Sequence, residues 1–199
     1  MIKLNNVCFS YGEKQILHQL SYTFPDSGVF AIMGESGEGK TTLLRLLCGL
    51  EKPSTGKITA SYKKIAVSFQ EPRLLPWLNC AENLNFVLPE EKRSSNIARR
   101  LLRDFELSEY YEKLPDALSG GMKQRLSLAR ALAVDADLLL LDEPFSALDA
   151  ALKERVAALV KKANPNGLTI MITHDKRDAE LLGASVLTLE NSTLIPLLS

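Results

Sequence analysis

The sequence predicts an α/β fold with three parts: a core around a mixed sheet, an N-terminal antiparallel β-subdomain and a small inserted α-helical subdomain. Three observations predict it. A short apolar run at residues 29–33 leads through a glycine-rich loop into a segment with leucines on one helical face. Four consecutive leucines at 138–141 are typical of a strand that is buried on both faces in a parallel sheet. Between them, residues 80–117 change to a helical apolar period, which indicates an insertion.

Composition narrows the class of protein. A chain of 199 residues is long enough for one substantial core with a small appendage, and its 46% hydrophobic and 24% charged residues are ordinary for a globular protein. The 24 lysines and arginines balance the 24 aspartates and glutamates. Without a global basic field, nucleic acid is a poor candidate partner.

Cysteine usage and hydropathy bear on the compartment. Cys8, Cys48 and Cys80 are odd in number, far apart and not in a CxxC pair, so we expect reduced thiols in a cytosolic protein rather than disulfides or a zinc site. The N-terminus has no signal pattern, and no apolar run approaches the roughly 18 residues of a membrane span. If the protein works at a membrane, we expect another chain to recruit it there.

The N-terminal region reads as an antiparallel sheet. Residues 2–9 alternate loosely between apolar and polar, and residues 20–24 repeat with period two, so both segments are expected to be half-buried strands. Tyr11 and Gly12 are expected at the turn between them. The ring of Tyr11 could stack on a nucleotide base, although a tyrosine at a turn is more often a plain rim residue.

The strand at Val29–Met33 leads into a loop that fits the pattern GxxxxGK[ST], as expected for a P-loop NTPase core. Its glycines allow positive φ angles, which turn backbone N–H groups toward an anion, and the helix that follows offers its positive end. In this motif the lysine reaches the β- and γ-phosphates and the threonine hydroxyl ligates Mg²⁺. The loop residues expected at the nucleotide are Gly34, Glu35, Ser36, Gly37, Glu38, Gly39, Lys40, Thr41 and Thr42.

Two further strands are expected at 57–62 and 64–69, with Gln70 where the second one ends. Residues 71–78, EPRLLPWL, form a proline-broken apolar loop with the only tryptophan. Two interpretations stay open for this loop: packing onto the protein's own core, or an exposed patch that docks a partner.

The helical insertion ends before a second candidate anion site. Residues 97–105 place apolar side chains on one helical face and Arg99, Arg100 and Arg103 on the other, which we interpret as a solvated face. Ser119-Gly120-Gly121 then precedes a helix expected at 122–134. A serine N-cap with two glycines leaves free N–H groups at a helix N-terminus, which favours either an anion site or an ordinary capped helix.

Acidic residues and a histidine follow the two most apolar strands. Asp142 and Glu143 come directly after the leucine strand, at the end where ligands of parallel sheets bind. Adjacent carboxylates there suit two tasks, holding Mg²⁺ and taking a proton from attacking water. Residues 146–149 lead into an amphipathic helix, and a buried strand at 168–173 delivers His174, which is well placed to touch a phosphate.

These pieces occur in one order: the phosphate loop, Gln70, LSGGMKQR at 118–125, LLLLDE at 138–143, SALD at 146–149 and His174. In that order the chain resembles the ATP-binding cassette (ABC) ATPases along nearly its whole length. The resemblance implies a single ABC ATPase domain over residues 1–199. Its nucleotide-binding core and β-subdomain would take residues 1–70 and 135–199, and the loop after Gln70, the helical insertion and the signature helix would take 71–134.

The resemblance also implies ATP and Mg²⁺ as ligands and a head-to-tail dimer with two ATP molecules between the subunits. In one subunit, Tyr11 matches the residue that stacks on adenine, and Lys40 matches the phosphate ligand. Thr41 and Asp142 match the Mg²⁺ ligands, and Gln70 matches the residue that contacts metal and water. Glu143 matches the catalytic base, and His174 matches the γ-phosphate contact. The other subunit would supply Ser119, Gly120 and Gly121 to the γ-phosphate, and Asp149 would lie across the interface. Glu38 departs from the family, which usually has a small residue there, and its charge could weaken ATP binding unless it points to solvent or pairs with a cation.

The segment EPRLLPWLNCAENL at 71–84 looks most like the ATPase subunits of importers for nitrate, sulfonates, taurine and related nutrients. The implied partners are a second ATPase subunit, integral membrane permease subunits and an extracytoplasmic solute-binding protein, with no nucleic acid. The implied location is the cytoplasmic face of the cell membrane. Two alternatives remain at this point: a soluble ABC-type ATPase acting on nucleic acid or ribosomes, and a non-hydrolysing nucleotide-binding module.

Overall fold

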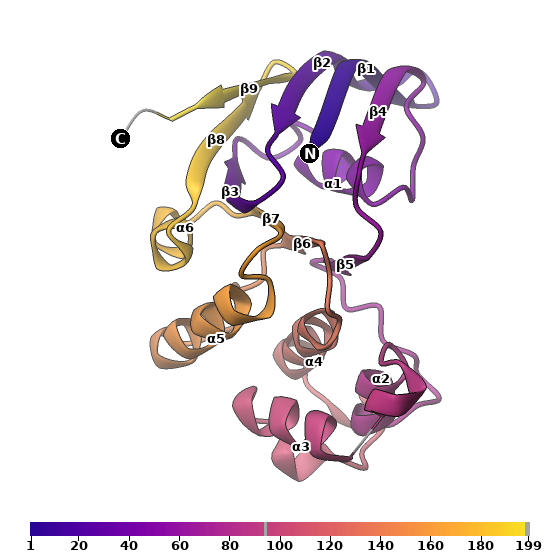
Figure 1. Cartoon of the computed structure of the whole chain (residues 1–199), viewed down its shortest axis with the longest axis vertical. Helices are drawn as coiled ribbons and strands as arrows, with labels where there is room; N and C mark the ends of the chain where they lie inside the picture. Colours follow the sequence, from indigo (N-terminus) through magenta and orange to yellow (C-terminus); the bar gives the residue numbers. More distant parts are fainter. Residues whose placement is uncertain (94, 198–199) are drawn as a thin grey trace.

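The computed structural model describes residues 1–93 and 95–197, which form two sheets and the helices around them (Figure 1). The strands are β1 (Ile2–Tyr11), β2 (Lys14–Phe24), β3 (Gly28–Met33), β4 (Thr55–Ala60), β5 (Ile65–Ser68), β6 (Leu138–Asp142), β7 (Leu168–Ile172), β8 (Ser185–Glu190) and β9 (Thr193–Pro196). The α-helices are α1 (Lys40–Leu47), α2 (Cys80–Asn85), α3 (Ser95–Asp104), α4 (Gly120–Ala133), α5 (Ala150–Ala163) and α6 (Lys176–Leu182). Short 3₁₀ turns lie at Glu90–Lys92, Ser108–Tyr110 and Pro115–Ala117.

The larger sheet is mixed, as the sequence predicts. Its strand order is β5-β6-β7-β3-β8-β9. The first five strands are parallel, and β9 pairs antiparallel with β8. Every residue of β6 and β7 is buried, because helices cover both faces at the centre of the sheet. The carboxyl ends of β3, β6 and β7 therefore meet at one edge, where three loops follow them.

The smaller sheet has the order β2-β1-β4 and is antiparallel throughout. Ile2, Leu4, Val7 and Phe9 of β1 are buried, although register shifts between them interrupt strict alternation. The predicted N-terminal antiparallel β-subdomain is confirmed. The exposed edge and face of this sheet stay polar, as is usual for an antiparallel sheet that packs on one side only.

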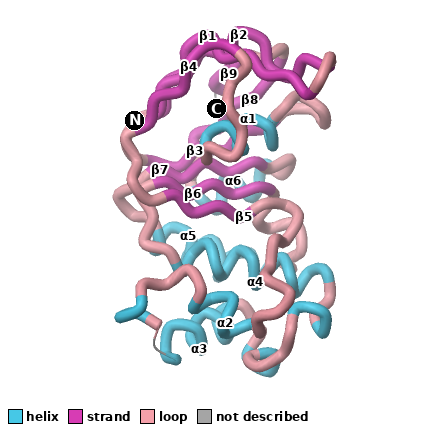
Figure 2. The backbone as a smooth tube through the Cα atoms, turned by 90° about the vertical axis from the view of Figure 1, so that its right-hand side faces the viewer, coloured by secondary structure: helices cyan, strands magenta, loops and turns pink. Residues whose placement is uncertain are grey.

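The elements stack in layers, seen edge-on in Figure 2. Helix α1 lies between the two sheets, and its buried leucines belong to one apolar cluster with the inner faces of both: Leu43, Leu44, Leu46 and Leu47. Helices α4 and α5 cover the opposite face of the larger sheet, and α2 and α3 lie beyond them (Figure 2). The residues buried on that face form a second apolar cluster, which includes the fully buried Phe105 and Phe145. The helical insertion therefore packs on α4 rather than on the sheet itself.

Helix α3 confirms the predicted apolar stripe. Ala98, Leu101 and Leu102 are buried, and the three arginines of the helix are exposed. The guanidinium of Arg99 lies over the ring of Tyr111, with its carbon 4.4 Å from the ring centroid. This stacking and the solvated positions agree with the interpretation of the arginine row as an exposed face.

The proline-broken loop at 71–78 combines the two interpretations that the sequence left open. Leu74 packs against the buried cluster, whereas Trp77 is 71% exposed. The buried side chain of Asn83 fixes the backbone of this loop. It accepts the N–H of Leu75 at 2.9 Å and donates to the carbonyls of Leu75, Leu78 and Asn79. A buried amide with every bond satisfied fixes the backbone on which Trp77 is displayed.

Some expected boundaries shift by a few residues. Strand β4 begins at Thr55 and ends at Ala60, two residues earlier than expected at each end, because Thr55 already pairs with Cys8 of β1. Strand β1 continues to Tyr11, which pairs with Lys14 across a two-residue turn. Helix α4 begins at Gly120, two residues before the expected start, since Ser119 caps it. Within the described part of the chain, no helix is long and apolar enough to cross a membrane.

Candidate active site

The phosphate loop joins β3 to α1 and adopts left-handed backbone angles at its glycines. The φ angles are 141° at Gly34, 94° at Gly37 and 92° at Gly39. A methyl group at Gly34 would lie 2.5 Å from the carbonyl oxygen of Leu189, so this residue also permits the close approach of β8. These angles are accessible to glycine at no steric cost, and they create a concave row of backbone N–H groups that suits an anion.

Lys40 is the first residue of α1, and its side chain bends back across the loop. Its ammonium group donates to the carbonyl oxygens of Gly34 at 2.8 Å and Glu35 at 2.7 Å. The cation therefore lies in the loop rather than out in solvent. A phosphate group in the loop would meet this ammonium, the loop N–H groups and the N-terminus of α1 together.

A cavity of about 500 Å³ opens beside the loop. It brings together residues from the β-subdomain, the loop and the ends of three strands of the larger sheet. The lining residues are Lys14, Ile16, Gly34, Ser36, Gly37, Gly39, Lys40, Thr41, Thr42, Gln70, Asp142, Glu143, Ile172 and His174. Most of the residues that the sequence assigns to one nucleotide site thus line one cavity.

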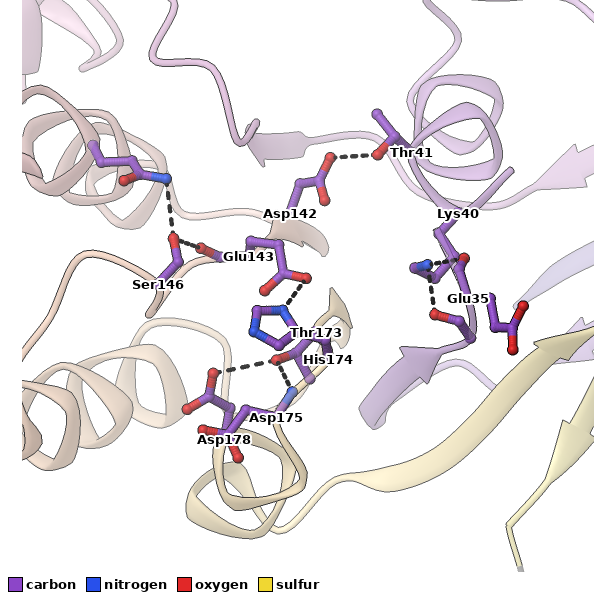
Figure 3. A network of polar contacts seen from close by, with 12 residues as sticks. Glu35, Lys40, Thr41, Asp142, Glu143, Ser146, Thr173, His174, Asp175 and Asp178 are labelled. Atoms are coloured by element: carbon purple, nitrogen blue, oxygen red, sulfur yellow. Dashed lines mark hydrogen bonds and ion pairs between the residues drawn. The ribbon is translucent and has the colours of Figure 1, made fainter. Parts of the chain in front are cut away.

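Asp142 and Thr41 form a candidate magnesium pair. The hydroxyl of Thr41 donates to Oδ2 of Asp142 at 2.9 Å, and Asp142 is only 3% exposed (Figure 3). Burial raises the pKa of the Asp142 carboxyl, and the neighbouring charge of Glu143 adds to this, while the bond from Thr41 opposes it. A buried carboxylate of this kind favours a cation beside it, and hydroxyl and carboxylate oxygens are ligands that Mg²⁺ prefers.

Glu143 has an unusual backbone. Its φ angle is 50°, in the left-handed region that costs a non-glycine residue about 1–3 kcal/mol. Bonds on both sides hold it there: its N–H donates to Ile172 of β7 at 3.0 Å, and its carbonyl accepts the hydroxyl of Ser146 at 3.0 Å. This strain aims the side chain away from the end of β6 and toward the cavity, where its exposed fraction is 14%.

His174 completes this edge of the cavity. Its Nδ1 lies 2.9 Å from Oε1 of Glu143, and its side chain is 77% exposed (Figure 3). The hydrogen bond and charge of Glu143 raise the pKa of the imidazole above its usual 6.5, with smaller contributions from Asp175 and Asp178. The cavity thus holds a carboxylate and an imidazole in direct contact, two groups of the kind that can accept a proton and contact an anion.

This contact predicts a pH dependence. Because the folded-state pKa of His174 is raised, the stabilisation from its charge interaction with Glu143 is fully present below about pH 6.5 and is lost as the pH rises through the folded pKa. We expect an NMR titration of the His174 ring without nucleotide to give a midpoint above 6.5. In the Glu143→Gln variant the midpoint should fall toward the ordinary value, and an unchanged midpoint would contradict the contact.

Several residues assigned to the nucleotide do not line this cavity. The carboxylate of Glu38 accepts the backbone N–H of Asn191 at 3.1 Å, so its charge is directed to the β8–β9 turn. Glu35 contributes its carbonyl to Lys40 while its side chain lines a neighbouring hollow. Tyr11 packs edge-on against Phe9, with ring centroids 4.8 Å apart, and its hydroxyl accepts a bond from Arg45.

The residues at the start of α4 and α5 lie outside the cavity as well. Ser119 and Gly120 are exposed, and the Ser119 hydroxyl accepts the N–H of Met122 at 3.3 Å. Asp149 is exposed too and caps α5 by accepting the N–H of Leu152 at 2.9 Å. The capped helix ends therefore face solvent, where a second chain could meet them.

Three lining residues carried no sequence signal strong enough to single them out. Lys14 and Ile16 enter the cavity from β2, and Ile172 is the last residue of β7. Lys14 pairs with Tyr11 across the first turn, so a basic residue just after that turn was the available clue. Gln124 lies in LSGGMKQR, but the sequence assigns it no separate role; its side-chain amide donates to the Gln70 carbonyl at 3.3 Å and to the Ser146 hydroxyl at 3.2 Å.

Comparison with known proteins agrees with this geometry. The family model described as ABC transporter matches residues 17–146. The aliphatic sulfonates import ATP-binding protein of Granulibacter bethesdensis is 41% identical over 98% of this chain and 82% of that protein. The protein of the same name from Corynebacterium glutamicum is 42% identical over 93% of this chain and 78% of that protein.

Solved structures give the same result. A dimeric bacterial ABC transporter cassette superposes with a TM-score of 0.86 at 29% identity, covering 98% of this chain and 96% of that one. A dimeric post-hydrolysis cassette bound to ADP and phosphate gives 0.85 at 28% identity with the same coverage. The family match and the coverage of these relatives together establish that this chain belongs to the ABC transporter family of ATP-binding cassettes.

Proposed function

We propose that this chain hydrolyses ATP as the cassette subunit of an importer and drives a separate membrane permease. One observation carries the proposal: the phosphate loop, the Asp142–Glu143 pair and His174 line a single cavity of about 500 Å³. The similarity to import ATP-binding proteins and to a cassette bound to ADP and phosphate supports it. We propose the domain division predicted from the sequence, with the core and β-subdomain at 1–70 and 135–199 and the remainder at 71–134.

In the proposed reaction, the loop N–H groups and Lys40 bind the β- and γ-phosphates. Thr41, Asp142 and Gln70 would hold Mg²⁺, which supplies positive charge to the phosphate oxygens when bound. Glu143 accepts the proton of the attacking water, and His174 contacts the γ-phosphate while keeping the Glu143 side chain in place. Tyr11 would reach the base only after its ring turns from the present contact with Phe9.

The site needs a second subunit. Ser119, Gly120, Gly121 and Asp149 lie outside the cavity of their own chain, and we propose that they close the cavity of a neighbour. The exposed, capped N-terminus of α4 would then face the γ-phosphate, where its free N–H groups and dipole favour negative charge. The dimeric state of the cassettes similar to this chain supports this arrangement.

We propose that the loop at 71–78 docks the permease. Trp77 is 71% and Phe86 60% exposed; Trp77 lies in the segment that Asn83 fixes, and Phe86 follows α2 directly. Large exposed aromatic side chains on a fixed backbone are the usual anchors of a protein interface. Nitrate, sulfonate or taurine is the class of cargo we propose, and an extracytoplasmic solute-binding protein would deliver it on the far side of the membrane.

The docking proposal predicts the effect of Trp77→Ala. We expect the variant to bind the permease at least about 30-fold more weakly, since truncation of an interface tryptophan costs about 2 kcal/mol or more. ATP hydrolysis by the isolated chain should stay unchanged, because Trp77 does not line the cavity. The measurement is co-purification from gently extracted membranes, and Ile195→Ala on β9, which is 47% exposed, is the matched control.

The same experiment tests the function as a whole. Recovery of the native chain with a polytopic membrane protein supports the transporter, and identification of that protein gives the system. Absence of any membrane partner under gentle extraction would overturn it, together with the proposed location on the cytoplasmic face. The balanced charge and the import proteins among the relatives give no support to an ATPase that acts on nucleic acid or ribosomes.

A further inference from the structure

An ion pair between α5 and α6 lies outside the cavity and has no role in the reaction described above. Lys153 Nζ is 2.8 Å from Oδ1 of Asp178, whose side chain is only 4% exposed. A second, longer contact of 3.6 Å joins Lys153 to Asp175. Removing a charge from water is unfavourable, and a pair at this depth is no better for stability than apolar residues of the same shape. The ion pair is therefore expected to act by fixing the relative positions of α5 and α6 rather than by adding stability.

The second oxygen of Asp178 reaches the end of β7, which carries His174. The hydroxyl of Thr173 donates to Oδ2 of Asp178 at 3.2 Å, and the same hydroxyl accepts the N–H of Asp175 at 3.1 Å (Figure 3). Thr173 is fully buried, and its own N–H donates to Ile32 of β3 at 3.3 Å. One hydroxyl thus fixes the residues immediately before and after His174.

Lys153 connects this network to the other end of the site. It lies in the first turn of α5, where its backbone N–H donates to the carbonyl of Asp149 at 2.9 Å. The Asp149 side chain caps the same turn. Lys153, one turn from Asp149, is therefore bonded to Asp178, which accepts the Thr173 hydroxyl. These contacts connect the exposed loop at Asp149 to His174, which contacts Glu143.

We infer that Lys153, Asp178 and Thr173 are positioning residues that couple the loop at Asp149 to the contact between His174 and Glu143. The inference rests on the proposed function, which places Asp149 against a second subunit. A shift of α5 caused by that contact moves Lys153, and the ion pair transmits the shift through Thr173 to the backbone of His174. Contact with the second subunit then adjusts the position of the Glu143–His174 pair relative to the γ-phosphate.

The first test removes one hydroxyl without changing charge or shape. Thr173→Val should lower kcat by about 10-fold or more, because small misplacements of a catalytic pair have effects of this size, with KM for ATP changed less than about 2-fold. Thr173→Ser keeps the hydroxyl and should restore kcat. Equal kcat in the valine variant, or a serine variant as slow as valine, would overturn the role of Thr173.

The second test separates positioning from stability. Lys153→Met leaves the buried Asp178 carboxylate without its cation, and Asp178→Asn leaves Lys153 with only the longer contact to Asp175. Both are expected to lower Tm, whereas the double variant should recover most of the Tm. If the pair positions His174, kcat in the double variant stays at least about 10-fold low while ATP binding is retained. A double variant with both native Tm and native kcat would overturn the inference.

Failure of this inference differs from failure of the proposed function. If the unmodified chain hydrolyses no ATP in its complete assembly, the function is wrong and the kinetic tests do not apply. If the unmodified chain hydrolyses ATP and the Thr173→Val and double variants match its kcat, the network has a purely structural role. A readout without activity is available as well: ring NMR of His174 in Thr173→Val should show a weakened contact with Glu143, and an unaltered His174 signal would contradict the coupling.

Discussion

Glu143→Gln is expected to lower ATP turnover by about 10² to 10⁴-fold while ATP still binds. The carboxylate lies in the cavity with 14% of its side chain exposed, in contact with His174 and next to the candidate magnesium pair. Glutamine has the same shape and can keep the hydrogen bond to His174, but it cannot accept a proton from water. The loss of turnover is therefore attributed to the lost proton transfer. It is measured as phosphate release, with nucleotide binding measured in parallel.

Backbone strain makes glutamine the right substitution. The φ angle of 50° at residue 143 is equally unfavourable for glutamate and glutamine, so the variant leaves the backbone energy unchanged. Glycine would relax that strain and alanine would open the cavity, and either change would mix two effects. Glu38→Gln is the matched control, because the Glu38 carboxylate is bonded to Asn191 and does not line the cavity.

The outcome discriminates between two mechanisms. If turnover in Glu143→Gln equals that of the unmodified chain, Glu143 is not the base. If ATP binding is lost together with turnover, the residue contributes to the ground state rather than to proton transfer. Accumulation of ATP-bound dimer in the variant is the result that the proposed reaction requires, since a bound but uncleaved γ-phosphate keeps the two subunits together.

Much of this site was predictable because each element carried its own local signal. The phosphate loop combines glycines that need positive φ with a lysine at a helix start, and the structure has positive φ at Gly34, Gly37 and Gly39. The leucine strand and the strand before His174 are fully buried, so continuous apolar runs identified both. Parallel pairing then brings their carboxyl ends to one edge, which follows from topology rather than from any single residue.

The sequence alone could not predict contacts between side chains that are far apart along the chain. The direction of the Glu38 side chain depends on the β8–β9 turn, 153 positions away along the chain. The position of the Tyr11 ring depends on Arg45 and Phe9, so a local aromatic at a turn could not show it. Gln124 likewise acquires its contact with Gln70 only when α4 packs beside β5. Such contacts are set by packing between elements, which no spacing pattern encodes.

A second large loss of turnover is expected from Ser119→Asp. Aspartate caps a helix as well as serine, so the bond to the Met122 N–H and the fold of the single chain should persist. Its added carboxylate would face the γ-phosphate held by a neighbour, and we expect turnover to fall by about 10²-fold or more because a repulsive negative charge would oppose the stabilising helix dipole. Ser119→Asn, a neutral cap of the same size, should be much more active.

Mixing two inactive chains then tests whether the catalytic pocket is shared. A dimer of one Ser119→Asp chain with one Lys40→Ala chain has a single intact site, in which the native lysine of the first chain meets the native serine of the second. Random pairing of equal amounts should restore at most about a quarter of native turnover, and less if both sites must be intact. If each Ser119 served its own cavity, every site in the mixture would carry one defect and no activity would return. Recovery on mixing can arise only when the two halves of a working site belong to different chains.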